Sequence, residues 1–440
     1  MTRKTRYALV GTGGRAVMFI DPLATRFKHQ GELVALCDPN PARLEYHNDR
    51  LVRELGYHEV PTFDAHEFDA MVEQTRPDTV IVTTIDALHH KYVIRAMELG
   101  CDAVTEKPMT IDAEKCNAIL EAVERTGKRL RVTFNYRWGP GVTTVRKMLS
   151  EGVIGEVIHA DLDYMLDTSH GADYFRRWHR EKDKSGGLIV HKATHHFDLV
   201  NWWLDAVPET VYGMGRLAFY GRANAERRGQ AVKYDRYHGS DTADDSFAID
   251  LTANEKLRGL YLDAEKHDGY VRDRNVFGDN ITIEDTMSLL VRYRTGVVLN
   301  YSLNAYLPQE GFHVSFNGTK GRMEYREAHS VTVAGQGEQA IADHRPRYHL
   351  VVRPLFGEAY EVEIAEAEGG HGGGDPLLQA QIFDPDATPD LLGRDAGHGQ
   401  GAASALIGIS ANRSFETGQP VRVDEICPML GDATHLSELR

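Results

Sequence analysis

The sequence of 440 residues contains little cysteine and no long hydrophobic run. Its four cysteines, at positions 37, 101, 116 and 427, are far apart and never take the CxxC spacing. This favours a reduced, cytoplasmic protein over a disulfide framework. No stretch approaches the roughly 18 apolar residues of a membrane span. The basic residues 1–6 lead directly into an apolar strand without the hydrophobic core of a signal peptide.

Basic residues are also in the minority. Lysine and arginine number 50 against 65 aspartates and glutamates, which gives a formal net charge of −15. Binding to a phosphate backbone or an anionic membrane needs a basic patch, so no nucleic acid or membrane partner is expected. With 42% hydrophobic and 26% charged residues, the chain has the composition of a globular protein, and its length predicts two or three domains.

Short apolar runs alternate with helical patterns through the first third of the chain, which indicates βαβ units and a parallel sheet. The expected strands are residues 7–10, 33–37, 60–63, 79–83, 103–105 and 130–134. Helices are expected at residues 91–99 and 113–125. This order predicts a doubly wound Rossmann domain.

A glycine-rich sequence follows the first expected strand. Residues 11–16 fit the pattern G-x-G-x-x-G/A of a dinucleotide-binding turn, whose glycines permit a tight turn and a close approach of the backbone to a pyrophosphate. A turn with only a structural role is the alternative interpretation. The residues expected to bind the cofactor here are Gly11, Thr12, Gly13, Gly14 and Arg15.

Asp38 ends the second expected strand. A carboxylate at this place binds the ribose hydroxyls of NAD and repels the 2′-phosphate of NADP, so NAD is the expected cofactor. Arg43 lies nearby and weakens this preference, which keeps NADP as an alternative. Asp38 is also suited to cap the turn formed by residues 38–41.

Two further strand-end motifs complete a family resemblance. The sequence E-K-P at residues 106–108 follows the fifth expected strand, and Thr84 and His89 follow the fourth. With the glycine-rich turn, they resemble the T-P-N-x-x-H and E-K-P motifs of the Gfo/Idh/MocA family of nicotinamide-dependent oxidoreductases. The resemblance extends the expected cofactor-binding residues to Thr84, His89, Glu106 and Lys107.

The resemblance continues beyond the first domain, with departures in two motifs. Residues 185–198 resemble the family segment G-G-x-L-x-D-x-G-x-H-x-x-D, with His195 and Asp198 in register. His191 and Ala193 stand where that segment has its first aspartate and its later glycine, and Ile85 and Asp86 stand where the T-P-N-x-x-H motif has its proline and asparagine. Residues 411–421 resemble the closing helix and turn of the family.

The resemblance implies roles for Lys107 and His195, and with His191, which departs from the family pattern, these are the expected catalytic residues. His195 would accept the proton of a substrate hydroxyl, and Lys107 would bind the same oxygen and stabilise the charge that develops there. His191 is expected to bind the substrate or to take part in proton transfer. The alternative for His191 is a structural histidine that binds a carbonyl group.

The apolar spacing of residues 189–204 predicts one helix with one buried stripe. The adjacent face of this helix carries His191, His195, Asp198 and Trp202. The i, i+4 spacing of the two histidines, with His179 or His196 as a third ligand, is also that of a zinc site. Lys192 puts a cation beside the pair and disfavours a bound dication, so no metal is expected.

Aromatic rings and forked donors, which suit polyhydroxylated ligands, gather at residues 173–180, where a solvated surface loop is the alternative. His371 begins a glycine-rich loop that would close on the substrate or act as a hinge. The expected substrate-binding residues are Lys107, Arg177, Trp178, His179, His191, His195 and His371. Tyr136 and Arg137, at the domain junction, are further pocket candidates.

After residue 138 the pattern changes to longer alternating strands, at residues 157–164, 288–293, 297–303 and 313–316. We expect a Rossmann domain over residues 1–138 and an α+β domain over residues 139–440, with a large, mainly antiparallel sheet for substrate binding and oligomerisation. The polar residues 221–279 are expected to form an insertion of little regular structure at the pocket or at an oligomer contact. The exposed sheet face and the resemblance indicate a homodimer or homotetramer.

The expected function is that of a cytoplasmic NAD-dependent dehydrogenase acting on a ring hydroxyl of a sugar, glycoside or cyclitol, by hydride transfer to nicotinamide. The alternative is a glycoside-cleaving enzyme that retains NAD and uses transient oxidation followed by elimination. A regulator that senses a dinucleotide without catalysis is a third hypothesis, against which the presence of both Lys107 and His195 argues.

Overall fold

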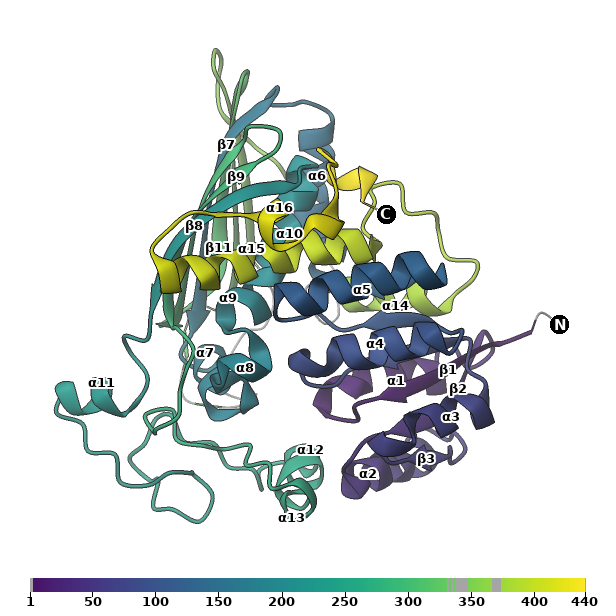
Figure 1. Ribbon diagram of the computed structural model, residues 1–440. Coiled ribbons are helices and arrows are strands. Elements are labelled where there is room, and N and C mark those ends of the chain that lie inside the picture. Colours follow the sequence, from purple (N-terminus) through teal and green to yellow (C-terminus); the bar gives the residue numbers. More distant parts are fainter. Residues whose placement is uncertain (1–2, 331, 334–335, 337–346, 366–372, 440) are drawn as a thin grey trace.

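The chain folds around two β-sheets, one of seven and one of nine strands (Figure 1). A computed structural model describes residues 3–330, 332–333, 336, 347–365 and 373–439. The predicted substrate-binding residue His371 lies outside the described residues. Within them, no helix is both long and apolar enough to cross a membrane, and the four cysteines are buried free thiols.

The smaller sheet is the expected doubly wound one. Its strand order is β15-β6-β5-β4-β1-β2-β3, and all neighbours are parallel except the pair of β15 and β6. The strand bounds are β1 Thr5–Val10, β2 Gly31–Cys37, β3 Thr62–Phe63, β4 Thr79–Val82, β5 Asp102–Thr105, β6 Leu130–Val132 and β15 Ala396–Gly397. The strand order reverses between β1 and β4, so a crevice is expected at the carboxyl ends of these two strands.

Five helices flank this sheet: α1 Val17–Ala24, α2 Pro41–Arg53, α3 Phe68–Thr75, α4 His89–Glu98 and α5 Ala113–Thr126. Local sequence determines several of their ends. The side chain of Asn40 caps α2 by accepting from the backbone N–H of Ala42, and Asp112 caps α5 in the same way through Lys115. Such caps pair N–H groups that the first helical turn leaves without partners.

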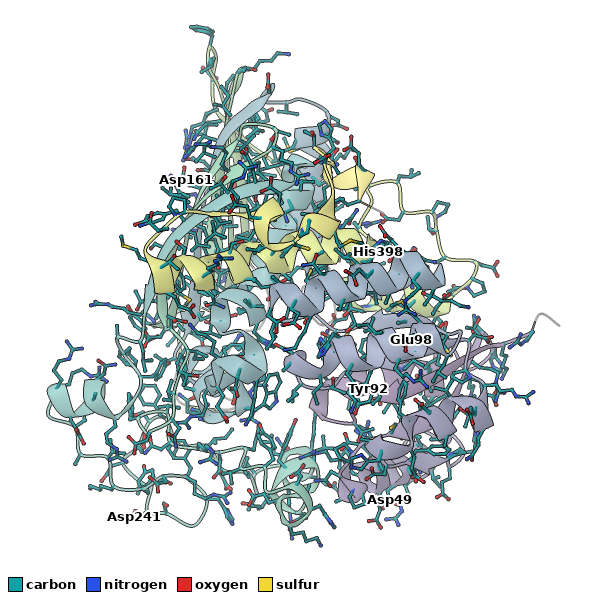
Figure 2. The ribbon with its side chains drawn as sticks, in the orientation of Figure 1. Asp49, Tyr92, Glu98, Asp161, Asp241 and His398 are labelled. Atoms are coloured by element: carbon teal, nitrogen blue, oxygen red, sulfur yellow. The ribbon has the colours of Figure 1, made fainter. Side chains whose placement is uncertain are left out.

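The larger sheet has the order β14-β13-β12-β11-β7-β10-β9-β8-β16. It is antiparallel apart from the pair β7 and β10, which agrees with the expected second domain. Its strands are β7 Val157–Asp167, β8 Pro208–Arg216, β9 Thr286–Tyr293, β10 Val298–Leu307, β11 Glu310–Gly318, β12 Gly321–Ser330, β13 Arg347–Pro354, β14 Tyr360–Glu361 and β16 Val421–Arg422. Asp161 in β7 lies on this sheet, whereas Asp49 and Tyr92 belong to the Rossmann domain (Figure 2).

Helices cover one face of the larger sheet. The helices after β6 are α6 Pro140–Ser150, α7 His170–Arg176, α8 Lys182–Ser185, α9 Leu188–His191, α10 Ala193–Leu204, α11 Arg222–Arg227, α12 Glu255–Leu257, α13 Glu265–Asp268, α14 Gly374–Phe383, α15 His398–Thr417 and α16 Val423–Ile426. Aromatic side chains of α10 pack on the sheet, for example Trp203 on Phe316 of β11 and His196 on Tyr164 of β7. The long helix α15 lies over α10 and β8 (Figure 1).

The prediction of one helix with one buried stripe over residues 189–204 was wrong in two respects. The segment is divided at Lys192 into α9 and α10, because the N–H of His195 binds the carbonyl of Lys192 in a tighter turn than that of an α-helix. Nearly every residue of both helices is buried, since they lie between the larger sheet and α15. Gly408 of α15 permits this packing, because a Cβ there would lie 2.3 Å from the carbonyl oxygen of Ile189.

Arg137 and Asp198 form an ion pair that is completely buried and does not line the predicted pocket. Arg137 Nη2 lies 2.6 Å from Asp198 Oδ1, and both side chains are 0% exposed. Arg137 also donates to the side chain of Gln400 and to the carbonyl of Gly393. The expectation that Arg137 faces the pocket was therefore wrong, because Arg137 instead joins the domain junction to α10 and α15.

We expect Asp198→Ala to lower the free energy of unfolding by about 3–5 kcal/mol, since it leaves the Arg137 charge buried without its partner. Urea unfolding followed by circular dichroism measures this. Asp69→Ala is the matched control, because Asp69 pairs with Arg95 while half exposed, and such a pair contributes about 1 kcal/mol or less. An equal effect of the two substitutions would contradict the structural role of the buried pair.

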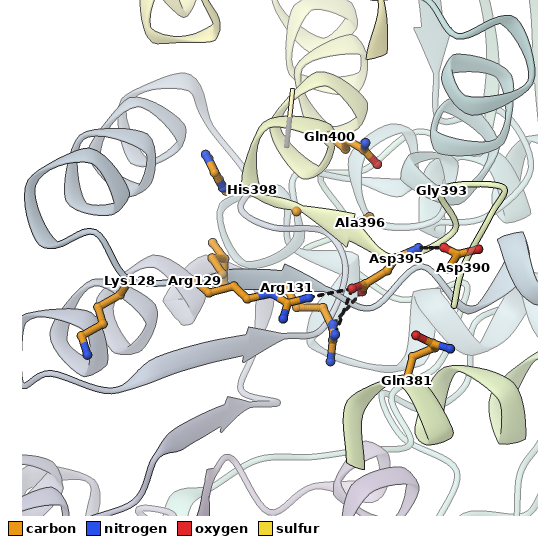
Figure 3. A pocket seen from close by; sticks show the side chains of 12 residues that line it. Lys128, Arg129, Arg131, Gln381, Asp390, Gly393, Asp395, Ala396, His398 and Gln400 are labelled. Carbon is orange, nitrogen blue, oxygen red and sulfur yellow. Dashed lines mark hydrogen bonds and ion pairs between the residues drawn. The ribbon is translucent and has the colours of Figure 1, made fainter. Parts of the chain in front are cut away.

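The two domains share their core and one sheet. A single cluster of buried apolar residues runs from the Rossmann strands through α15 to the larger sheet. Close to the C-terminal end, β15 adds an antiparallel strand to β6, and Asp395 beside it pairs with both Arg129 and Arg131 at a cavity of about 490 Å³ (Figure 3). These contacts hold the second domain against the sheet edge of the first.

Candidate active site

A cavity of about 610 Å³ opens at the carboxyl ends of β1 and β4, where the strand order reverses. Its opposite walls come from α7, the turn after it, α9 and the insertion between β8 and β9. Most predicted site residues line it: Gly11, Gly13, Gly14, Arg15, Asp38, Thr84, His89, Glu106, Lys107, Arg177, Trp178, His179, His191 and His195. Residues predicted from separate motifs are thus brought together.

Thr12 is an exception among the residues predicted for the cofactor. Its side chain is buried and does not line the cavity. Its backbone N–H donates to Asp38 Oδ2 at 2.7 Å, and its carbonyl lies 3.0 Å from His47 Nε2. Thr12 therefore holds the shape of the turn, while its neighbours face the cavity.

The glycine-rich turn fits a dinucleotide phosphate. Gly11 has a φ of +91°, and a Cβ at this position would lie 2.5 Å from the backbone nitrogen of Thr84. A Cβ at Gly13 would have no heavy atom within 4 Å, so the backbone there faces open space. The turn leads into a short 3₁₀ turn, Gly14–Ala16, and then into α1. Amide groups at such a helix start attract an anion.

Asp38 performs the turn-capping role that its sequence allows. Its carboxylate accepts from the backbone N–H groups of Thr12 and Asn40, at 2.7 and 2.8 Å. Arg43 Nη1 lies 3.8 Å from Asp38, but only 2.7 Å from Asp268 of the insertion. Burial raises the pKa of the Asp38 carboxyl, and the amide hydrogen bonds oppose this. Arg43 is thus placed between two carboxylates.

Glu106 and His89 brace the strand ends around the cavity. Glu106 Oε1 accepts from Arg15 Nε at 2.8 Å and from the Thr133 hydroxyl at 3.0 Å. The His89 ring is buried, with Nδ1 2.8 Å from the carbonyl of Pro108 and Nε2 3.2 Å from that of Thr84. His89 therefore ties the end of β4 to the loop that carries Lys107.

Lys107 projects from the end of β5 toward α9. Its Nζ donates to the carbonyl of His191 at 3.1 Å and lies 3.4 Å from His191 Nε2. Burial lowers the pKa of Lys107 to about 8, although the carboxylates of Asp86 and Glu106 oppose the shift. An ammonium group has three N–H donors, so Lys107 keeps a donor for a ligand in the cavity.

Asp86 is the partner of His191. Asp86 Oδ2 lies 2.5 Å from His191 Nδ1, and the Asp86 residue is only 3% exposed. Burial raises the pKa of the Asp86 carboxyl well above its ordinary value, while burial and the charge of Lys107 lower the pKa of His191 well below its own. Because an ammonium group can only donate, the contact of Lys107 Nζ with His191 Nε2 places the ring lone pair at Nε2 and the ring N–H at Nδ1, where it donates to Asp86.

Aromatic side chains form the wall on the other side of His191. His179 stacks on Trp178 with ring centroids 3.6 Å apart, and the His191 ring meets His179 edge-on at 4.3 Å. Tyr174 lies edge-on to His191 at 5.4 Å. Arg177 pairs with Asp173 at 3.0 Å and also lines the cavity. Burial lowers the pKa of His179 well below its usual value. The imidazoles of this wall are therefore uncharged.

His195 lies at the end of the cavity nearest the larger sheet. Its ring is parallel to that of Tyr136, with centroids 4.2 Å apart. Lys192 Nζ donates to the Tyr136 hydroxyl at 3.0 Å and lies 4.0 Å from Glu310 Oε1. Glu310 also contacts His170 Nδ1 at 2.9 Å. Tyr136, Lys192 and His170 therefore form a second group of polar side chains in the cavity beside His195, and it includes the predicted pocket residue Tyr136.

Several lining residues were not named individually from the sequence: Asp86, His170, Tyr174, Lys192, Tyr261, Asp268 and Tyr270. Tyr174 belongs to the predicted aromatic segment 173–180, and the last three to the insertion 221–279, which was expected at the pocket or at an oligomer contact. A signal for Asp86 was present, because two of the departures from the family motifs occur together. The segment loses its aspartate at position 191, and the strand-end motif gains one at position 86. Within the described residues, no cluster of three or more histidine, cysteine or acidic side chains is suited to hold a metal ion.

A glycine-rich turn and an aspartate at the ends of adjacent parallel strands, beside a cavity lined with ionisable side chains, are typical of the class of nicotinamide-dependent oxidoreductases. Two family models match the chain: the NAD-binding Rossmann fold of the Gfo/Idh/MocA oxidoreductase family over residues 5–134, and the C-terminal alpha/beta domain of that family over residues 146–423. The chain belongs to the Gfo/Idh/MocA family of oxidoreductases.

Individual relatives extend over the whole chain. YteT of Bacillus subtilis (strain 168) is 36% identical over 95% of this chain and 98% of its own length. A scyllo-inositol 2-dehydrogenase (NAD(+)) of the same organism is 24% identical over 96% of this chain and 98% of its own length.

Solved structures share the fold. The aldose-aldose oxidoreductase of Caulobacter crescentus, complexed with glycerol, is 17% identical with a TM-score of 0.61, and the alignment covers 96% of this chain and 100% of that one. The WlbA dehydrogenase of Bordetella pertussis, in complex with NADH and UDP-GlcNAcA, is 18% identical with the same TM-score of 0.61 and covers 96% of this chain and 99% of that one.

Proposed function

We propose that the protein is an NAD-dependent dehydrogenase that oxidises a ring hydroxyl of a sugar, glycoside or cyclitol. The observation that carries this proposal is the position of Lys107. Its ammonium group lies in the same cavity as the glycine-rich turn, between the strand end that would hold the cofactor and the histidines of α9 and α10. Family membership and a relative named as an inositol dehydrogenase support the substrate class.

The chain's residues suit a bound nicotinamide dinucleotide. Gly11, Gly13 and Gly14 would receive the pyrophosphate, since the backbone at Gly13 faces open space. Asp38 would meet the adenosine ribose. Thr84, Glu106 and Arg15 line the cavity between these groups and Lys107. Bound NAD would accept a hydride from the carbon that carries the reacting hydroxyl.

Lys107 and His195 would lie on either side of the reacting hydroxyl. Lys107 donates a hydrogen bond to its oxygen and stabilises the negative charge that develops as the proton leaves. His195 accepts that proton, a role for which imidazole is suited near neutral pH. His191 binds the substrate or passes a proton through Nε2, the ring atom that faces Lys107.

The aromatic wall favours a neutral polyol. Sugar rings pack their C–H faces on aromatic side chains such as Trp178 and Tyr174, and hydrogen-bonding groups such as Arg177 and His179 select the hydroxyl pattern. The net charge of −15 does not oppose such a ligand, because a polyol carries no charge.

The test is a screen of the purified protein with NAD and NADP against sugars, glycosides and inositols. Nicotinamide absorbance and the release of free sugar are followed together. Production of NADH with at least one polyol supports the proposal. Failure to bind either dinucleotide would show it to be wrong.

A second candidate function is cleavage of a glycoside with NAD retained. The observation that favours it is a second group of polar side chains beside His195. Tyr136, Lys192 and His170 line the cavity, and Glu310 contacts Lys192 and His170. Oxidation alone needs one base, whereas elimination needs a base for an acidic C–H and an acid for the departing oxygen. Sugar release without accumulation of free NADH would distinguish this function from the first.

The charges around Arg43 lead us to expect a preference for NAD over NADP. Asp268 pairs with Arg43, so Arg43 is not available to neutralise the 2′-phosphate of NADP. This phosphate would lie beside the Asp38 carboxylate and be repelled by it. We expect Asp38→Asn to reduce the ratio of kcat/KM for NAD to that for NADP about 10- to 100-fold, because a like-charge repulsion of a few kcal/mol is removed. Asp49→Asn, on the exposed side of α2, is the control. An unchanged ratio in Asp38→Asn would contradict this account of the preference.

We also propose that the protein forms a homodimer or homotetramer through the outer face of the larger sheet. Met214 and Leu290 are 66% and 48% exposed there and line one hollow together with polar residues such as Asp161 and Asn300, while the opposite face carries α10 and α15. Protein interfaces commonly combine exposed apolar and polar side chains in this way. Sedimentation equilibrium tests this, and a monomer at micromolar concentration would contradict it.

A further inference from the structure

The insertion between β8 and β9 crosses from the second domain to the cofactor groove of the first. It leaves β8 beside Asp285, whose carboxylate accepts from the backbone N–H groups of residues 218–220. Its middle carries Asp241 away from both sheets (Figure 2). It then turns back, so that α12 and α13 lie beside α2 of the Rossmann domain (Figure 1).

Hydrogen bonds hold residues 255–270 of this insertion on the Rossmann domain. Asn40 donates to the carbonyl of Ala264 at 3.0 Å in a buried contact. Arg43 donates to the carbonyl of Leu260 at 3.0 Å and pairs with Asp268 at 2.7 Å. We call residues 255–270 the strap.

The strap reaches the glycine-rich turn itself. The Tyr261 hydroxyl accepts from the backbone N–H of Gly14 at 3.1 Å. This amide begins the 3₁₀ turn that leads into α1, the part of a Rossmann domain that receives a pyrophosphate. A hydroxyl can accept one hydrogen bond and donate another, so Tyr261 can bridge the Gly14 amide and a phosphate oxygen. Asp268 and Tyr270 line the same cavity.

The other side of the strap is anchored to its own domain. Arg236 pairs with Glu265 at 2.6 Å and with the buried Asp273 at 2.6 Å. Just beyond the strap, Arg272 pairs with Asp173 of α7 at 2.8 Å. The strap therefore spans the groove between two fixed attachments and is more than a surface loop resting on α2.

We propose that the strap is a cofactor-binding element of the second domain, with Tyr261 at the pyrophosphate and Asp268 beside the ribose, and that its detachment from α2 limits nucleotide exchange. This inference rests on the proposed function, since it requires a bound nicotinamide dinucleotide. It assigns a binding role to residues that lie about 250 positions from the glycine-rich turn, a separation of 247 for Tyr261 and Gly14.

The test measures nucleotide release directly. The wild-type protein is loaded with NADH, the bound NADH fluorescence is recorded, and a large excess of NAD is added to follow dissociation. The variant Tyr261→Phe/Asp268→Asn removes the contact to Gly14 and the charge that pairs with Arg43. We expect NADH to dissociate at least tenfold faster from this variant than from wild type.

Tyr234→Phe is the matched control, because Tyr234 belongs to the same insertion but donates to Asp245. It is expected to release NADH at the wild-type rate. The unfolding temperature without nucleotide is compared for all proteins, and Tyr261→Phe alone, which removes one oxygen, is used if the double variant is unstable. Equal release from the strap variant and wild type would overturn the inference. A wild-type protein that binds no dinucleotide would overturn the proposed function first, and the inference with it.

Discussion

Lys107→Met is expected to lower kcat about 10²- to 10³-fold, the cost of removing one preorganised donor to a developing oxyanion. Methionine keeps the length of the side chain but lacks the ammonium group, which lies 3.1 Å from the His191 carbonyl and faces the cavity. Nucleotide binding should change little, because the glycine-rich turn and Asp38 are untouched. Steady-state kinetics with the polyol found by the screen, together with NADH binding by fluorescence, measure both effects.

The pH dependence of the wild type follows from the same group. Lys107 must be protonated to donate, and its pKa is lowered to about 8, so the protonated fraction decreases as pH rises through 8. Asp86, Glu106, Lys192 and Arg15 face it and contribute to this pKa. Oxidation should therefore become slower above about pH 8 as this donor is lost.

The variant Lys107→Arg tests whether loss of the Lys107 charge causes the decrease in rate above pH 8. An arginine stays protonated throughout this range, so the decrease above pH 8 should disappear while some activity remains. Lys147→Met on α6 is the control for a lysine that is 65% exposed, and it should leave kcat unchanged. If Lys107→Met retained the wild-type kcat, Lys107 would take no part in the reaction.

The parts of the site that follow from strand ends were predictable from the sequence. Gly11 and Asp38 come directly after strands of the parallel sheet and Lys107 comes two residues after one, and the carboxyl ends of such strands meet at one edge. For each of these residues, the local motif was therefore enough to predict its place at the strand end and the other strand-end residues near it. The doubly wound order and the mainly antiparallel second sheet were predictable for the same reason, since alternating apolar runs report local structure.

Contacts between distant segments were not predictable in this way. His191 and Asp86 are 105 residues apart, and their contact depends on how α9 packs against the end of β4. Arg137 faces Asp198 because α10 and α15 enclose it, although its place beside Tyr136 suggested the pocket. These pairs depend on long-range packing, which cannot be read from the local pattern of a single sequence.

The Asp86–His191 pair also connects two of the departures from the family motifs. The aspartate lost at position 191 is matched by one gained at position 86, after β4, and its carboxylate contacts the His191 imidazole, which faces Lys107. Because His191 Nδ1–H donates to Asp86, Nε2 keeps a lone pair facing Lys107 and the cavity. The pair thus places a proton acceptor at Nε2 and fixes the orientation of its ring through Asp86.

Asp86→Asn is expected to lower kcat about 10²- to 10⁴-fold, within the range for general acid–base groups. The amide of asparagine would donate to His191 Nδ1, which moves the ring proton to Nε2 and points an N–H at the Lys107 ammonium. KM should change less than kcat, because the aromatic wall and its donors stay in place. The exposed Asp183 of α8 provides the control Asp183→Asn, which should retain wild-type kinetics.

A double-mutant cycle decides whether Asp86 acts through His191. If Asp86 acts only through His191, the double variant Asp86→Asn/His191→Ala should have the same kcat as His191→Ala alone. Once the imidazole is absent, removing the Asp86 charge has no further effect. If the two reductions in kcat multiply in the double variant, Asp86 has a separate role, such as keeping Lys107 protonated. Unchanged turnover of His191→Ala would exclude the imidazole from proton transfer, and with it the pair as the feature that replaces the family aspartate.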